Sequence, residues 1–268
     1  MTCACGHHHH PRHHHEAKGT PVPMMAPMLG VTGRLICADA GQMMTALSLL
    51  PDHIRQSREE PGCLRFEMWQ DEDPLVWNLS ELFLDADAFA AHGARTRASD
   101  WGRDSTGITR DLHRLEVIPV IRRETRQDLD AIDVLLREAF DGEAEAQLVR
   151  RLRADGDLSL SLVADAGGTI LGHAALSPLS ADRPAHALAP VAVAPKAQRL
   201  GIGTALVREA VSWADEASVV VLGDPAYYGP LGFLPADLVS PYAGPGLQMI
   251  GDLPRGTAIR HAPAFAAL

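Results

Sequence analysis

Residues that can bind an anion follow one another closely in the second half of the chain. Arg199 comes just before Gly201 and Gly203, and an apolar segment with helical spacing follows them. Glycines lack a Cβ and let an anion reach the backbone, while the free N–H groups and the dipole at a helix start attract negative charge. The arginine can add a charge-assisted contact to a phosphate. This order of residues predicts a site for the pyrophosphate of a nucleotide-like cofactor.

The loop differs from two common phosphate-binding motifs. It lacks the third glycine and the downstream acid of a Rossmann fingerprint, and it lacks the Gly-Lys-Ser/Thr end of a P-loop. Gln198, Gly201 and Gly203 instead match the Gln/Arg-x-x-Gly-x-Gly/Ala pattern of the GNAT superfamily of N-acetyltransferases, which the loop therefore resembles. In that superfamily the loop holds the pyrophosphate of acetyl-coenzyme A (acetyl-CoA).

A second stretch extends the resemblance. The segment VLGDPAYYGPLGF begins at Val221, and Tyr228 precedes its Gly-Phe pair by four residues, as a tyrosine does in the superfamily. The resemblance covers residues 118–268 and implies a mixed α/β sheet domain that uses acetyl-CoA. It also implies that Tyr228 is the general acid for the leaving thiolate. The cofactor-binding residues that it implies are Val191, Val193, Gln198, Arg199, Leu200, Gly201, Ile202, Gly203 and Thr204.

No general base is evident from the sequence. The strand expected at residues 187–194 contains none of the acidic residues that some relatives place there. An acceptor amine that arrives neutral needs no base, so this point stays open. The side chains that could serve, directly or through water, are His173, Asp224, Glu143 and Glu145.

The N-terminal half carries a different pattern. Residues 28–117 predict the order strand, helix, strand, strand, helix, strand, which is typical of a split βαβ sandwich. Pro51 is expected to bend or divide the first helix. The segments EPGCLRFE, SELF and DAFAAH resemble the antibiotic biosynthesis monooxygenase (ABM) family of ferredoxin-like dimeric α+β barrels.

The ABM resemblance implies a homodimer through the N-terminal domain and a cavity between sheet and helices. In that family the cavity oxidises phenols or quinols without a bound cofactor. Glu81 and His92 take the places of recurrent Glu and His residues, and Trp77 and Asn78 could line the same cavity, with His92 as a catalytic base. His92 and Glu81 can equally be structural polar residues. Haem degradation is disfavoured, because residues 30–34 lack the asparagine of that branch.

Length, charge and hydropathy limit the function further. A chain of 268 residues has room for two domains. Its formal net charge of −10 argues against nucleic-acid or anionic-membrane binding, and it favours cationic amine acceptors. No apolar run is long enough to span a bilayer and no signal-peptide core begins the chain, so we expect a cytoplasmic protein. Cys37 and Cys63 are expected to be reduced core residues.

These observations predict an α+β protein with three parts. Residues 1–27 form a disordered, His-rich tail in which no fixed geometry supports a metal site, residues 28–117 an ABM-like domain, and residues 118–268 a GNAT domain. The predicted function is acetyl-CoA-dependent N-acetylation of a small amine or a protein amino group. One alternative is quinol oxidation in the N-terminal domain with a regulatory GNAT domain. The other is a non-catalytic ligand-binding dimer.

Overall fold

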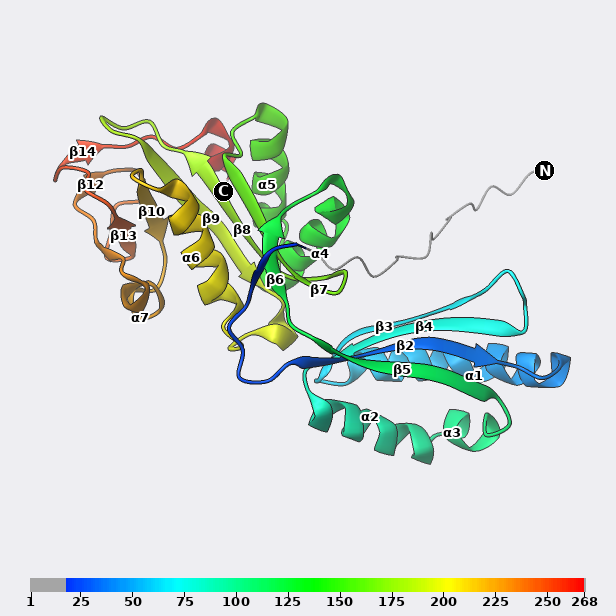
Figure 1. Ribbon diagram of the computed structural model, residues 1–268. Coiled ribbons are helices and arrows are strands. Elements are labelled where there is room, and N and C mark those ends of the chain that lie inside the picture. The colour runs from blue at the N-terminus through cyan, green and yellow to red at the C-terminus, as the bar shows by residue number, and fades with distance from the viewer. Residues whose placement is uncertain (1–17, 268) are drawn as a thin grey trace, which may run out of the picture.

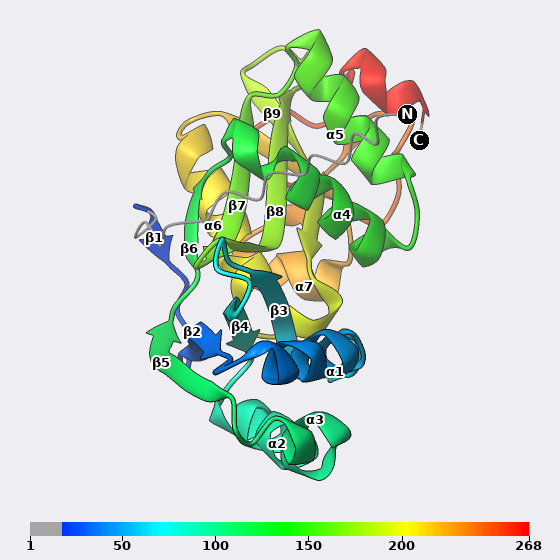
Figure 2. The ribbon, with the colours of Figure 1, turned by 90° about the vertical axis from the view of Figure 1, so that its right-hand side faces the viewer.

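The computed structural model describes residues 18–267, which form two domains that lie end to end (Figures 1 and 2). The His-rich run and its two cysteines, Cys3 and Cys5, lie outside the described residues. Within residues 18–267, none of the helices combines the length and the apolar character that a bilayer span requires.

The N-terminal domain is a four-stranded antiparallel sheet with helices on one face. Its strand order, β3-β4-β2-β5, is that of a ferredoxin-like fold, as predicted. The elements are β2 (Met28–Ile36), α1 (Ala40–Glu59), β3 (Cys63–Gln70), β4 (Val76–Phe83), α2 (Ala86–Ala98), α3 (Asp100–Asp104) and β5 (Thr109–Val117).

Side-chain caps start the two long helices of this domain. Asp39 before α1 and Asp85 before α2 each accept the backbone N–H three residues further on. Pro51 lies inside α1 and does not divide it, contrary to one of the two expected outcomes. The ring of an exposed proline removes one backbone hydrogen bond, and the burial of the adjacent Leu50 and of Ala46 in the core offsets that loss.

The C-terminal domain is built on an eight-stranded mixed sheet, with the order β1-β6-β7-β8-β9-β10-β13-β11. A parallel pair, β9 and β10, lies near its centre. The elements are β1 (Thr20–Pro21), β6 (Val120–Arg123), α4 (Leu129–Phe140), α5 (Ala144–Asp155), β7 (Leu160–Ala166), β8 (Thr169–Pro178), β9 (Ala185–Val193), α6 (Ile202–Ala214), β10 (Ser218–Leu222), α7 (Pro225–Tyr228), β11 (Leu234–Pro235), β12 (Leu238–Val239), β13 (Leu247–Ile250) and β14 (Thr257–Ala258).

Alternating side chains of β7 separate the two covered faces of this sheet. Leu162 packs in the cluster that holds Leu206 of α6, whereas Val163 packs with Leu136 of α4. Helix α6 therefore covers one face and helices α4 and α5 cover the other (Figure 1). The helical spacing of Leu206, Ala210 and Trp213 predicts that all three point into the core, but Trp213 is 38% exposed, and the Arg123 guanidinium lies over its ring.

The segment before β2 differs from the predicted tail. Strand β1 pairs with β6 at the edge of the C-terminal sheet, and the side chain of Val22 is buried. Residues 18–27 thus cross from the C-terminal domain to the N-terminal domain as a strap (Figure 1). Met28, Leu82 and Val117 of the N-terminal domain are buried in the core cluster of the C-terminal domain, so the two domains pack together.

Candidate active site

The predicted phosphate loop lies between β9 and α6. Backbone φ angles are +66° at Arg199 and +83° at Gly201, both in the left-handed region. Glycine adopts this region freely, and a non-glycine residue there is uncommon and often marks a functional loop. Gly201 is the N-cap of α6, and no side chain among residues 18–267 caps that helix. The first turn also lacks an acidic residue, so its N–H groups remain free for an anion.

Two glycines keep this helix start bare. A Cβ at Gly203 would lie 2.6 Å from the hydroxyl of Tyr227 and 3.4 Å from Val193 Cγ2. A Cβ at Gly201 would lie 3.4 Å from the carbonyl oxygen of Pro23 in the strap. A side chain at either position would take up space beside the helix start, and the two glycines leave that space open to a phosphate group.

The strands β9 and β10 separate beside this loop. Their recorded pairs run only from Ala185 and Ser218 to Ala187 and Val220, so residues 188–193 of β9 have no partner on β10. A register shift against β8 falls in the same part of β9. Val191 and Val193 lie in this unpaired stretch, where their main chain can meet an extended ligand arm.

Tyr228 lies at the far side of the same gap, in α7. Asp224 caps this short helix by accepting the N–H of Ala226. The Tyr228 ring packs edge-on against Phe233, with centroids 5.4 Å apart. Burial, and secondarily Tyr227, raise the pKa of Tyr228 to about 12, so the phenol stays protonated at physiological pH. Its hydroxyl has no hydrogen-bond partner in the described part of the chain.

Tyr227 joins the two predicted parts of the site. Its ring stands edge-on to Tyr228, with centroids 4.8 Å apart, and its hydroxyl hydrogen-bonds to Thr204 at the start of α6. The turn that carries Tyr228 is thereby fixed to the phosphate loop. No motif in the sequence singles out Tyr227 for this contact.

The candidate bases are not gathered near Tyr228. His173 is fully buried, bonds to Ser161 at 2.9 Å, and burial lowers its pKa to about 4. Glu143 forms ion pairs with Arg137 and Arg150 on the α4–α5 side. Glu145, in the first turn of α5, lies on that side too. Asp224 alone lies in the same turn as Tyr228.

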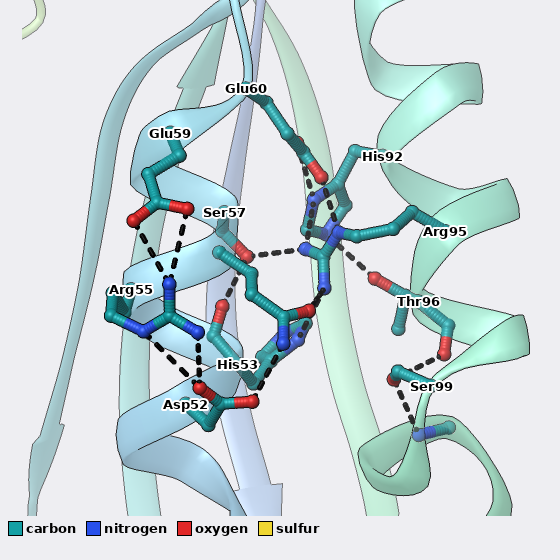
Figure 3. Close-up of polar contacts among 12 residues, drawn as sticks. Asp52, His53, Arg55, Ser57, Glu59, Glu60, His92, Arg95, Thr96 and Ser99 are labelled. Atoms are coloured by element: carbon teal, nitrogen blue, oxygen red, sulfur yellow. Dashed lines mark hydrogen bonds and ion pairs between the residues drawn. The ribbon is translucent and has the colours of Figure 1, made fainter.

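The imidazole of His92, in the N-terminal domain, lies among the polar side chains of Glu60, Arg95 and Thr96 (Figure 3). Its Nδ1 lies 3.0 Å from a carboxylate oxygen of Glu60, and its Nε2 lies 3.3 Å from the hydroxyl of Thr96. Arg95 donates to the other Glu60 oxygen at 2.6 Å. Burial lowers the pKa of His92 despite the nearby Glu60. Both ring nitrogens are engaged, which is the pattern of a structural histidine.

The other predicted cavity residues do not converge on one point. Glu81 points to the helix side of the sheet and is 7% exposed, and burial followed by the charge of Glu60 raises its pKa to about 7. Asn78, on the opposite face, donates to Asp71 in the hairpin. Trp77 Nε1 is buried, with no hydrogen-bond partner among the residues that the structure covers. No group of three or more possible metal ligands is found among them either.

Family models match both halves of the chain. The model for antibiotic biosynthesis monooxygenase matches residues 28–103, and the model for the acetyltransferase (GNAT) family matches residues 129–228. The N-terminal match agrees with the ferredoxin-like strand order, and the C-terminal match contains the loop and Tyr228.

Individual relatives resemble the C-terminal half. The uncharacterized N-acetyltransferase YhbS of Escherichia coli strain K12 is 43% identical over 121 residues, which are 42% of this chain and 72% of YhbS. The crystal structure of E. coli YhbS in complex with CoA has a TM-score of 0.52 at 35% identity and covers 55% of this chain and 92% of that one. A GNAT family acetyltransferase from Brucella melitensis in complex with acetyl-CoA has a TM-score of 0.48 at 34% identity, covering 55% and 97%.

Proposed function

The chain belongs to the GNAT family of acetyltransferases and uses acetyl-CoA, and we propose that it acetylates a small amine or a protein amino group. The observation that carries the proposal is the connection of Tyr228 through Tyr227 to the bare start of α6, across the gap between β9 and β10. An anion-binding loop and an acid group lie at one gap in the sheet.

Tyr228 is proposed as the general acid. Acetyl-CoA supplies the thioester whose carbonyl carbon the amine attacks. Tyr228 holds a proton on its hydroxyl, which has no partner among residues 18–267, and can donate it to the departing sulfur. Arg199, Gly201 and the N–H groups from Ile202 onward are proposed to hold the pyrophosphate.

The acceptor is proposed to be cationic before reaction. The net charge of −10 attracts such an amine. His173 bonds to Ser161, and Glu143 forms ion pairs on the α4–α5 side. Asp224 lies in the same turn as Tyr228, and one oxygen of its carboxylate caps α7 by accepting the Ala226 N–H, so its other oxygen is proposed to take the amine proton. Oxidation at His92 gains no support, because neither ring nitrogen is free for a phenol.

The domain limits proposed from the fold are 28–117 for the ABM domain and 118–267, together with the strap, for the transferase. A homodimer through the ABM sheet stays a prediction. The sheet face opposite α1 and α2 would form it, and one end of that face already packs against the transferase through Leu82 and Val117. Sedimentation velocity measures this directly.

The test is a calorimetric titration with acetyl-CoA, followed by thiol-release assays with a panel of small amines and lysine peptides. We expect saturable binding and a thiol release that depends on the amine. A reaction without amine measures simple hydrolysis as the control. Binding without any amine-dependent release would contradict the transfer reaction.

A further inference from the structure

A single lysine connects the phosphate loop to the other domain. Lys196 Nζ donates to three backbone carbonyl oxygens of the ABM domain: those of Arg58 at 2.7 Å, Glu60 at 2.9 Å and Cys63 at 3.2 Å. These residues form the turn that ends α1 and begins β3. We call residues 58–63 the docking turn.

The choice of lysine suits this contact. The chain has 24 Lys and Arg residues, of which only Lys18 and Lys196 are lysines. A compact ammonium offers three donors that can point to three converging oxygens, whereas a planar guanidinium fits carboxylates and phosphates better. The carbonyls at the end of α1 have no partners within the helix and carry the negative end of its dipole, which a cation stabilises.

Lys196 lies directly before the proposed cofactor contacts. It belongs to the short 3₁₀ helix η2 (Pro195–Ala197), in which Ala197 is fully buried, and Gln198 follows. The strap approaches the same loop from another direction, with the Pro23 carbonyl next to Gly201. The loop is therefore bounded by two segments that come before residue 118 in the sequence, the strap and the docking turn.

The docking turn is itself fixed to the ABM core. The Glu60 side chain binds His92 and Arg95, while its carbonyl oxygen accepts from Lys196 (Figure 3 shows the side-chain contacts). The Arg58 Nε donates to the Phe66 carbonyl at 2.9 Å. These side-chain contacts fix the position of the docking turn, and with it the three carbonyl oxygens that accept from Lys196.

We propose that Lys196 is a positioning residue of the acetyl-CoA site, which acts by tying the phosphate loop to the docking turn of the ABM domain. The ABM domain then serves as part of the scaffold of the cofactor site. A loop without this tie must be ordered when the cofactor binds, and that ordering reduces affinity. The inference rests on the proposed function in requiring acetyl-CoA binding.

The experiment compares Lys196→Met with Arg65→Met. Arg65 also crosses the interface, donating to the Gly167 carbonyl at 2.8 Å and the Thr169 hydroxyl at 2.7 Å, but it contacts the β7–β8 turn and not the loop. For Lys196→Met we expect acetyl-CoA to bind about fivefold more weakly, with KM raised and kcat unchanged at saturation. Amide exchange over residues 195–203 should rise in the ligand-free protein. Arg65→Met should leave both unchanged.

Two results would overturn the proposal. One is an unchanged affinity and exchange rate in Lys196→Met, and the other is an equal loss of affinity in Arg65→Met, which would mean that any loosening of the interface suffices. Lys196→Arg should recover less than half of the lost affinity, since a guanidinium cannot reach all three oxygens. If the wild type binds no acetyl-CoA, the proposed function fails, and the exchange data on the ligand-free proteins still decide whether Lys196 anchors the loop.

Discussion

Two polar regions of the molecule differ in whether their hydrogen-bonding groups have partners. One is the cluster around His92, and the other is the start of α6. Around His92, the imidazole nitrogens, the Glu60 carboxylate and the Arg95 guanidinium bond to one another and to their neighbours. At the start of α6, the backbone N–H groups have no side-chain cap among the described residues, and the Tyr228 hydroxyl nearby is also unpartnered. Reactive residue types occur in both regions, but only the second leaves hydrogen-bonding capacity for a ligand.

The largest effect is expected from filling the loop. Gly201→Trp places a side chain in the cradle at a φ of +83°, a conformation that costs a non-glycine residue about 1–3 kcal/mol. We expect acetyl-CoA affinity to fall roughly 100-fold or more, because strain and steric block add. Titration calorimetry measures it.

A matched control separates strain from the site. Gly156 ends α5 with a φ of +78° and has nothing within 4 Å of a Cβ position. Gly156→Trp should lower stability and leave acetyl-CoA affinity intact. Equal affinity in Gly201→Trp and the wild type would remove the loop from the cofactor site.

The next effect concerns the proton donor. Tyr228→Phe keeps the ring and removes the hydroxyl, so we expect kcat to fall about 100-fold while the acetyl-CoA dissociation constant changes less than about twofold. Steady-state rates with a responsive amine, combined with calorimetry, measure both. Tyr227→Phe is the companion variant and should affect binding more than kcat. Undiminished turnover in Tyr228→Phe would assign the proton to another group.

Glu81, which is buried in the same domain as His92, should make the stability of the protein depend on pH. Its folded pKa of about 7 exceeds its ordinary value of 4.5, so between these pH values the folded chain holds a proton that the unfolded chain loses. The Glu81 contribution to the free energy of unfolding therefore falls as pH rises from about 4.5 to 7. Relative to the wild type, Glu81→Gln should gain up to about 3 kcal/mol at pH 8 and little at pH 5.

Urea denaturation at the two pH values measures this difference. The lowered pKa values of His53 and His92 give the opposite slope below about pH 6.5, but they are shared by both proteins and cancel in the comparison. Glu67→Gln, at an exposed position of β3, is the control. A pH-independent difference between Glu81→Gln and the wild type would show that Glu81 is not desolvated.

Local patterns in the sequence were enough to predict most of the fold. The order of strands and helices in the N-terminal domain followed from hydrophobic spacing, and the mixed sheet of the C-terminal domain followed from its resemblance to the GNAT superfamily. The predictions for the loop and for Tyr228 followed from short motifs. Pro51 does not divide α1, because the packing of Leu50 outweighs the missing hydrogen bond. The position of Trp213 was wrongly predicted because helical spacing does not reveal that its ring lies between His186 and Arg123 and stays partly exposed.

The contacts that the sequence patterns did not predict are those between residues far apart in the chain. Strand β1 has two residues, too few for any periodicity. Lys196 meets the docking turn across 133 to 138 positions of sequence, and only its rarity as a residue type could have drawn attention to it. The partner of His92 Nδ1 is the carboxylate of Glu60, which is 32 residues away in the sequence. No short motif contains such pairs.

The pairing of β1 with β6 changes how the two domains are connected. The chain starts the transferase sheet at β1, leaves it to build the whole ABM domain, and returns at β6 next to where it left, with the Val22 N–H bonded to the Pro119 carbonyl. The ABM domain is therefore inserted into the transferase domain, and two adjacent segments of the chain connect the two domains. A single cut in the strap would leave it attached, and swivelling about one connection is opposed by the other.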